Sequence, residues 1–242
     1  MPSKLDVRWQ VDHIRVTVFA SVPAVLHDSN WFNAIAGRAP DESISRPAAG
    51  EAVDSGTLAG VTVEVRSGIG RIDLIVKAAN DSKSLSKYPL LGNYHDQADE
   101  YLPRACRWLS ELKFPITRLA FGTSLLAPET DRISSYNTLS RVLPMLRIDA
   151  ERMKELALQF NIPATCNSEA GLEINRIYHA SCITVKSLPN IERPDIALQS
   201  VFTRLDLDIN TAADNIRPLS DASATLVELR HHADAVYKEG FV

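Results

Sequence analysis

Four carboxylates are the residues whose types and spacing could do chemistry. Asp206 and Asp208 stand two positions apart on one predicted strand, so their side chains share a face. Asp73 occupies the matching place earlier in the chain, and Glu64 lies on the neighbouring strand of the same hairpin. Carboxylates that converge on one sheet face could hold Mg²⁺ for phosphodiester hydrolysis. A metal-dependent nuclease is therefore one alternative for the function.

Basic residues interleave with these carboxylates. Arg71 stands two positions before Asp73, and Arg204 two positions before Asp206. Lys77 and Arg204 would suit a nuclease, but the alternation of signs suits charge neutralisation better than metal binding. We therefore assign no catalytic residue and no metal ligand, and we expect no cofactor.

Other catalytic patterns do not emerge from the sequence. Gly68 and Gly70 stand between two predicted strands, without the helix and the Lys-Ser/Thr that a phosphate loop needs, and predict a hairpin turn. His231 and His232 are adjacent, so on a helix they point in different directions. Cys106 lies among apolar residues, which is typical of a structural thiol. The balance favours a protein that is not an enzyme.

Hydrophobic periodicity predicts the elements that position these side chains. Alternating apolar residues predict strands at 13–22, 58–66, 71–79, 116–126, 172–187 and 201–210. Helical spacing predicts helices at 24–36, 94–113, 133–143, 149–160 and 219–239. Polar composition predicts exposed loops at 38–56 and 80–92, and Pro103 predicts a kink or a break near Glu100.

The predicted elements occur twice in the same order. Residues 13–114 and 116–240 each have a strand, a helix, two strands and a final helix. Arg71-Ile-Asp-Leu in the first half matches Arg204-Leu-Asp-Leu in the second. We infer an internal duplication within a single domain that spans 1–242. Chance agreement between segments of an α+β chain is the other explanation.

Each half holds too few strands to form a stable sheet alone. We therefore expect an α+β fold with one antiparallel sheet of about six strands and the helices on one face. The apolar strand positions would face the helices, and the alternate positions would face outward. The predicted outer face carries Arg15, Thr17, Glu64, Arg66, Arg71, Asp73, Lys77, Arg204, Asp206 and Asp208.

This outer face is the candidate binding surface. The residues assigned to binding are Arg15, Glu64, Arg66, Arg71, Asp73, Arg204, Asp206 and Asp208. Exposed ion pairs contribute only about 0.2 to 1 kcal/mol each, so the same pattern also suits a solvated surface. A broad uncovered sheet with free edges favours pairing with another chain. We expect a protein partner or a homo-oligomer.

Composition limits the class of protein. The 242 residues are 45% hydrophobic and 23% charged, which is ordinary globular usage. A net charge of −4 argues against a broad nucleic-acid or anionic-membrane surface. Cys106, Cys166 and Cys182 are too widely spaced for a disulfide framework or a zinc site, and indicate a reducing, cytoplasmic setting. We expect neither a secretion signal nor a membrane span.

Three segments carry a resemblance to a known group. They are Ile116-Thr-Arg-Leu-Ala-Phe-Gly, Leu172-Glu-Ile-Asn-Arg and Arg204-Leu-Asp-Leu-Asp-Ile-Asn-Thr. With them the chain resembles a scattered family of uncharacterised bacterial proteins of similar length, mainly over residues 116–242. The resemblance supplies no catalytic residue. The patchy distribution of the group implies an accessory gene of a mobile or defence locus.

Three hypotheses for the function follow. The leading one is a non-enzymatic accessory or scaffold subunit that acts through protein–protein interaction. The second is the metal-dependent nuclease. The third is a nucleic-acid-binding module that uses basic residues of the outer face and loses affinity as salt rises. Its arginines would be Arg15, Arg66, Arg71, Arg118 and Arg204.

Overall fold

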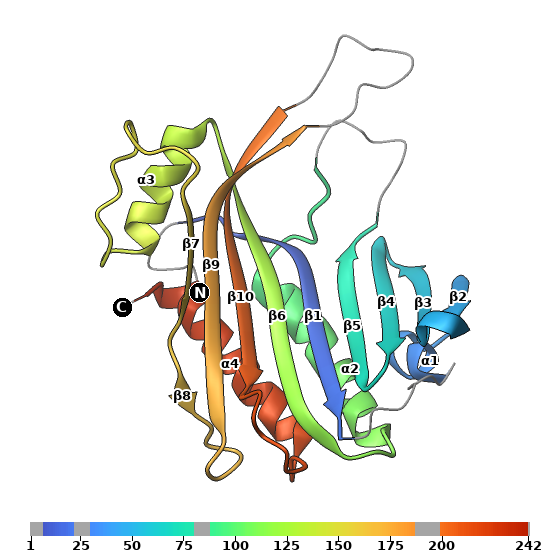
Figure 1. Cartoon of the computed structure of the whole chain (residues 1–242). Helices are drawn as coiled ribbons and strands as arrows, with labels where there is room; N and C mark the ends of the chain where they lie inside the picture. Colours follow the sequence, from blue (N-terminus) through green and yellow to red (C-terminus); the bar gives the residue numbers. More distant parts are fainter. Residues whose placement is uncertain (1–6, 22–29, 80–87, 187–198, 242) are drawn as a thin grey trace, which may run out of the picture.

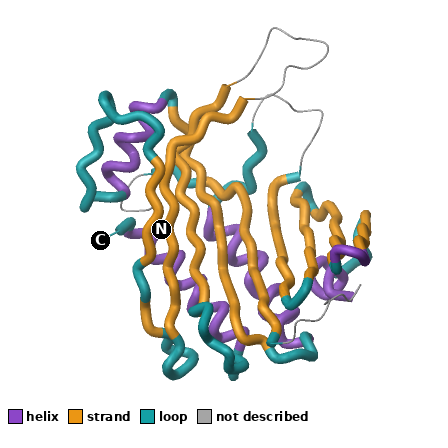
Figure 2. The backbone as a smooth tube through the Cα atoms, viewed as in Figure 1, coloured by secondary structure: helices purple, strands orange, loops and turns teal. Residues whose placement is uncertain are grey.

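One antiparallel sheet runs through the protein, and helices pack against it (Figure 1, Figure 2). The computed structural model describes residues 7–21, 30–79, 88–186 and 199–241. Its strands are β1 (Gln10–Ala20), β2 (Glu42–Arg46), β3 (Glu51–Leu58), β4 (Val61–Gly68), β5 (Arg71–Ala78), β6 (Ile116–Glu129), β7 (Ala157–Asn161), β8 (Ala164–Thr165), β9 (Glu173–Lys186) and β10 (Gln199–Thr211). Its helices are α1 (Asn30–Ala36), α2 (Tyr94–Glu111), α3 (Arg132–Val142) and α4 (Ala222–Glu239), with a short 3-10 helix, η1 (Pro47–Ala49), between β2 and β3.

The strand order places the two halves of the chain side by side. The order is β2-β3-β4-β5-β1-β6-β10-β9-β7, and β8 pairs with β9. The first strands of the halves, β1 and β6, pair in the middle, and each is flanked by the last strand of its own half, β5 or β10. This arrangement is compatible with the inferred duplication, which stays a prediction.

The protein belongs to the mixed α+β class, but the expected sheet of about six strands is wrong, because the described residues form ten. Of the additional strands, β2 and most of β3 lie within 38–56, which the polar composition assigned to a loop. Most of β7 lies within 149–160, which helical spacing assigned to a helix. β3 and β7 form strands because they pair with β4 and β9, which supply their backbone hydrogen bonds. Local composition does not reveal such pairing.

The other predicted helices lie near their expected positions as α2, α3 and α4. Of the kink or break expected near Glu100, the break does not occur, because α2 continues through Pro103. Buried residues on both sides of the proline, including Ala98 and Trp108, hold the helix in place. Of the helix expected at 24–36, α1 covers the last part and residues 24–29 lie outside the described residues, as do 80–87 of the second expected loop.

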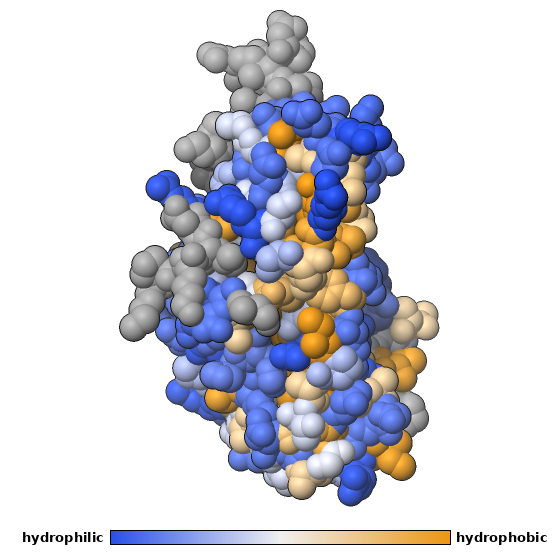
Figure 3. Space-filling view, turned by 90° about the vertical axis from the view of Figure 1, so that its left-hand side faces the viewer, coloured by the Kyte–Doolittle hydropathy of each residue, from blue (hydrophilic) through white to orange (hydrophobic). Residues whose placement is uncertain are grey.

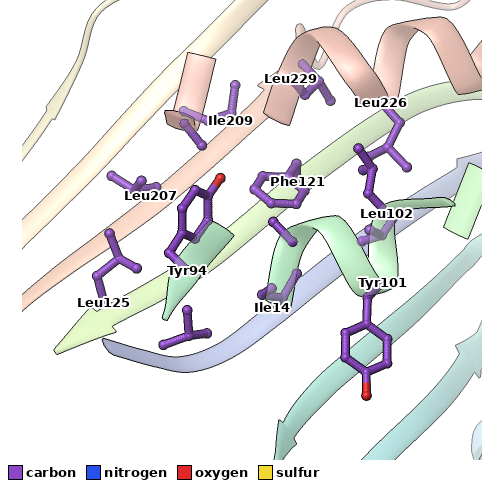
Figure 4. Packing of buried hydrophobic residues seen from close by; sticks show 14 of the residues in the cluster. Ile14, Tyr94, Tyr101, Leu102, Phe121, Leu125, Leu207, Ile209, Leu226 and Leu229 are labelled. Atoms are coloured by element: carbon purple, nitrogen blue, oxygen red, sulfur yellow. The ribbon is translucent and has the colours of Figure 1, made fainter. Parts of the chain in front are cut away.

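All described helices lie on the same face of the sheet. α2 and α4 contact each other and the central strands, while α1 contacts β3 and β4, and α3 contacts β9 and β10. The strands point alternate apolar side chains into this layer (Figure 4), where Ile14, Phe121 and Leu207 meet side chains of α2 and α4 such as Leu102 and Leu226. Each such side chain contributes about 1.5–3 kcal/mol on full burial, so this layer holds the fold together.

Candidate binding face

The predicted binding residues all lie on the sheet face opposite the helices, called the open face below. They follow from strand parity: Ile14, Val16 and Val18 are buried under the helices, so Arg15 and Thr17 point the other way. The register carries the same parity to Glu64 and Arg66 on β4, Arg71, Asp73 and Lys77 on β5, and Arg204, Asp206 and Asp208 on β10. Whether these residues bind a partner stays a prediction.

Three arginines of the open face bond a carboxylate two positions away on their own strand. The pairs and their Nε-to-carboxylate distances are Arg66–Glu64 at 2.9 Å, Arg71–Asp73 at 2.8 Å and Arg204–Asp206 at 2.8 Å. Alternation along a strand puts both members of each pair on one face. The Arg-x-Asp-Leu sequence that β5 and β10 share therefore produces the same contact twice.

Glu64 has two cationic neighbours. Its carboxylate accepts hydrogen bonds from Arg66 and also pairs with Lys77 of the neighbouring strand. Burial alone would raise the pKa of Glu64, but the hydrogen bonds from Lys77 and Arg66 outweigh burial and lower the pKa below its usual value. Glu64 is therefore ionised and already neutralised at neutral pH.

Arg15 reaches across β6 to a carboxylate of β10. Arg15, Gly122 and Asp208 are neighbours across β1, β6 and β10, and the Arg15 Nη2 lies 3.7 Å from the Asp208 Oδ2. A Cβ at Gly122 would lie 3.5 Å from the Arg15 guanidinium, which is ordinary van der Waals contact, so Arg15 passes directly over this position. On the same strand, Asp206 also meets the His179 Nδ1 at 3.3 Å.

The carboxylates of the two halves do not converge. Asp73 lies on β5 and Asp206 on β10, with β1 and β6 between them. Strands about 4.8 Å apart separate these two positions by roughly 14 Å across the sheet. The register separates them further along the strands, because Asp73 shares a row with Asn210 and not with Asp206. Carboxylates that share a metal ion lie within about 2.0–2.6 Å of it. The described residues contain no group of three or more His, Cys, Asp or Glu side chains that could hold a metal ion. The expected convergence is wrong, and the geometry lends no support to the nuclease.

An aromatic group that the site prediction omitted lies at one end of the open face. Phe19 is flanked by two arginines, with the Arg118 guanidinium 4.6 Å and the Arg71 guanidinium 5.6 Å from its ring centroid. Such cation–π contacts contribute about 0.5–1 kcal/mol at exposed sites. The signal in the sequence is an aromatic residue at an outward position of the alternating strand 13–22.

Next to this group the open face is hollowed. A hollow of about 670 Å³ lies over β2, β3, β4 and β5. Its lining includes Ile44, Arg46, Val53, Arg66 and Arg71. The strands β2 and β3 supply one side of it, so the hollow could not be predicted from a sequence analysis that assigned this segment to a loop.

Cys166, which the sequence places in a polar loop, is buried rather than exposed. Its thiol contacts Glu228 of α4 at 3.3 Å, and burial raises the pKa of this thiol. A thiol held protonated in this way is a structural residue, and it lies apart from the open face.

Comparison with known proteins finds no matching family model and no match among curated proteins. The resemblance to a scattered bacterial group therefore stays a prediction, as does the cytoplasmic location. Among the described residues, no helix has the length and apolar character needed to cross a membrane.

Proposed function

We propose that this protein is a non-enzymatic subunit that binds another protein through its open face. The observation that carries the proposal is the placement of all described helices on one face of a ten-stranded sheet, which leaves the other face uncovered by any described helix or strand. A broad sheet face of this kind offers a rigid, preformed surface to a partner.

Phe19 and its two arginines mark the proposed centre of the contact. Aromatic residues and arginines are the types that most often dominate binding energy in protein interfaces. The Nε atom of Arg118 is buried and has no hydrogen-bond partner in the described structure. A bound protein would instead meet the other N–H groups of this half-exposed guanidinium, which can donate to a carbonyl or carboxylate.

The distribution of charge favours a protein over a nucleic acid. All five arginines of the nucleic-acid hypothesis lie on the open face, but Arg66, Arg71 and Arg204 already bond carboxylates of that face. A phosphate backbone is bound by a continuous positive surface. Alternating charges suit a protein surface that presents both signs, because each ion pair can then meet its complement.

Substitution of Phe19 and Arg118 tests the proposal. The protein would be tagged in its own host, and partners that elute at fixed stoichiometry would be quantified for wild type, Phe19→Ala and Arg118→Ala. Loss of hot-spot side chains should weaken the complex at least about tenfold. Arg107→Ala, on the exposed side of α2, is the matched control and should retain the partner.

The outcome is decisive if all variants have the thermal stability of a folded protein. A partner retained by Phe19→Ala and Arg118→Ala, or lost equally with Arg107→Ala, would contradict the proposal. Membership of a bacterial mobile or defence locus belongs to the same proposal, and the resemblance described above is what supports it.

A further inference from the structure

The two edges of the sheet differ in chemistry. β2 begins with Glu42, ends with Arg46 and is followed by Pro47, and charges and prolines at an edge discourage pairing with another strand. β7 consists of Ala157-Leu-Gln-Phe-Asn161, which contains neither a charge nor a proline, and its register with β9 is regular. The β7 edge therefore lacks the charges and the adjoining proline that discourage pairing at the β2 edge.

The outer side of β7 presents backbone groups that no described strand pairs with. The Ile162 N–H donates to the Arg176 carbonyl at 3.0 Å, which fixes the phase of hydrogen bonding between β7 and β9. In an antiparallel ladder the bonding direction alternates along the strand. The N–H and C=O groups of Ala157, Gln159 and Asn161 consequently point away from β9, and no described strand pairs with this side.

Apolar side chains accompany this free edge. Leu158 and Phe160 are half-buried against the core on the helix side, and the Phe160 ring lies 5.4 Å from that of Tyr178. Exposed apolar side chains occur before and after β7, with Met145 (55% exposed) between α3 and β7 and Ile162 (39% exposed) directly after β7. Figure 3, which views this side of the molecule, shows apolar residues gathered in a band among polar ones.

The segment before β7 is held in place by α3. The Arg132 Nη1 donates to the Ala150 carbonyl at 2.8 Å and also bonds the Met153 carbonyl. The Tyr136 hydroxyl accepts a hydrogen bond from the Leu156 N–H at 2.8 Å. The backbone that leads into β7 is therefore held in place, which lowers the entropic cost of ordering this strand on binding.

We propose that β7 pairs antiparallel with β7 of a second copy of this chain, around a two-fold axis at Gln159. In this register Gln159 faces its own counterpart and Ala157 faces Asn161 of the second copy, so the outward backbone groups of both strands pair with each other. Leu158 then lies opposite Phe160 of the second copy, and apolar side chains meet on the helix side.

The absence of charge in β7 is what favours a second copy as the occupant. A charged residue at the two-fold axis would face an identical charge, which is unfavourable in a cross-strand pair. Gln159 has no such penalty and can donate and accept hydrogen bonds with its counterpart. The result is one sheet continuous through two chains. This inference goes beyond the proposed function, because it concerns a different surface.

Complementary charges at Gln159 test the register directly. Sedimentation of the purified protein over a concentration series should show a dimer for wild type. Gln159→Lys and Gln159→Glu should each weaken the dimer roughly fivefold or more, because each places like charges at the axis. An equimolar mixture of the two variants should dimerise at least as well as wild type.

Two controls make the result specific. Ser45→Lys, the same kind of change on the exposed edge strand β2, should leave the dimer intact, and so should Arg118→Ala on the open face. A wild-type protein that stays monomeric, or Gln159 variants that dimerise like wild type, would overturn the inference. If the tagged protein isolated from its own host carried a different protein, and both Gln159 variants lost that protein, the inference would be overturned in favour of a strand from a different chain.

Discussion

At the scale of single residues, the open face is defined by charges that are already paired. Thr17 donates to the Asp73 Oδ1 at 2.5 Å, and Arg71 bonds the same carboxylate through two nitrogens. Exposed pairs of this kind contribute only about 0.2–1 kcal/mol each to stability. Their main consequence is that they fix the orientation of the guanidinium and carboxylate groups that a partner would meet.

A half-buried carboxylate away from the open face makes the stability of the protein depend on pH. Glu228 of α4 accepts hydrogen bonds from the backbone N–H groups of Asn167 at 2.7 Å and Ser168 at 2.8 Å. Burial alone would raise its pKa, but these bonds outweigh burial and lower the pKa of Glu228 to about 2 from a usual value of 4.5. The stabilisation is therefore fully present above pH 4.5 and is lost as pH falls through 2.

Glu228→Gln should lower the free energy of unfolding at pH 7 by about 1 kcal/mol. The amide has only one oxygen, so one of the two backbone N–H groups loses its acceptor, and the effect stays small because Glu228 is partly exposed to solvent. Urea denaturation at a series of pH values would measure this. The difference from wild type should shrink as pH falls below 4.5. Glu111→Gln, on the exposed end of α2, is the control. A difference that stays constant with pH would contradict this account of Glu228.

At the scale of elements, α1 packs on β3 at a glycine. A Cβ at Gly56 would lie 2.9 Å from the Cζ of Phe32, and Phe32 is only 1% exposed. The glycine therefore allows the phenyl ring of α1 to lie directly on the strand.

Gly56→Ala should lower the free energy of unfolding by about 1–3 kcal/mol, because the buried ring must move. Gly68→Ala is the matched control, since no atom lies within 4 Å of the added Cβ and the backbone there is not left-handed. It should change stability by less than about 0.5 kcal/mol. Thermal and urea denaturation of the two variants would check this, and equal effects would show that α1 does not depend on Gly56.

Which elements could be predicted depended on burial. The central strands have one buried face, so alternation revealed β1, β5 and β10 and placed all predicted binding residues on the correct face. β2 has five exposed residues and no buried face, so it leaves no such pattern. β7 is too short for its alternation of Leu158 and Phe160 with polar residues to be distinguished from helical spacing, and its hydrogen bonds come from β9.

At the scale of the whole molecule, strand order determines which residues of the open face lie close together, and the sequence did not predict that order. Asp73 and Asp206 were correctly placed on one face, but β1 and β6 lie between their strands. Pairing between segments that are distant in the chain leaves no local signal in the sequence. Phe19 entered the site because β6 brought Arg118 beside it. The molecule then presents two separate surfaces, an open face proposed for a partner protein and a β7 edge proposed for a second copy.

The mass of the native complex is the measurement that tests the central claim most directly. The tagged chain of 26.7 kDa would be isolated from its own host under native conditions and weighed together with what elutes. The account predicts a defined assembly in which another protein is present at fixed stoichiometry and is released by Phe19→Ala. A chain recovered alone, as a monomer or only as a dimer of itself, would contradict the proposed function, and the dimer would leave the β7 pairing standing.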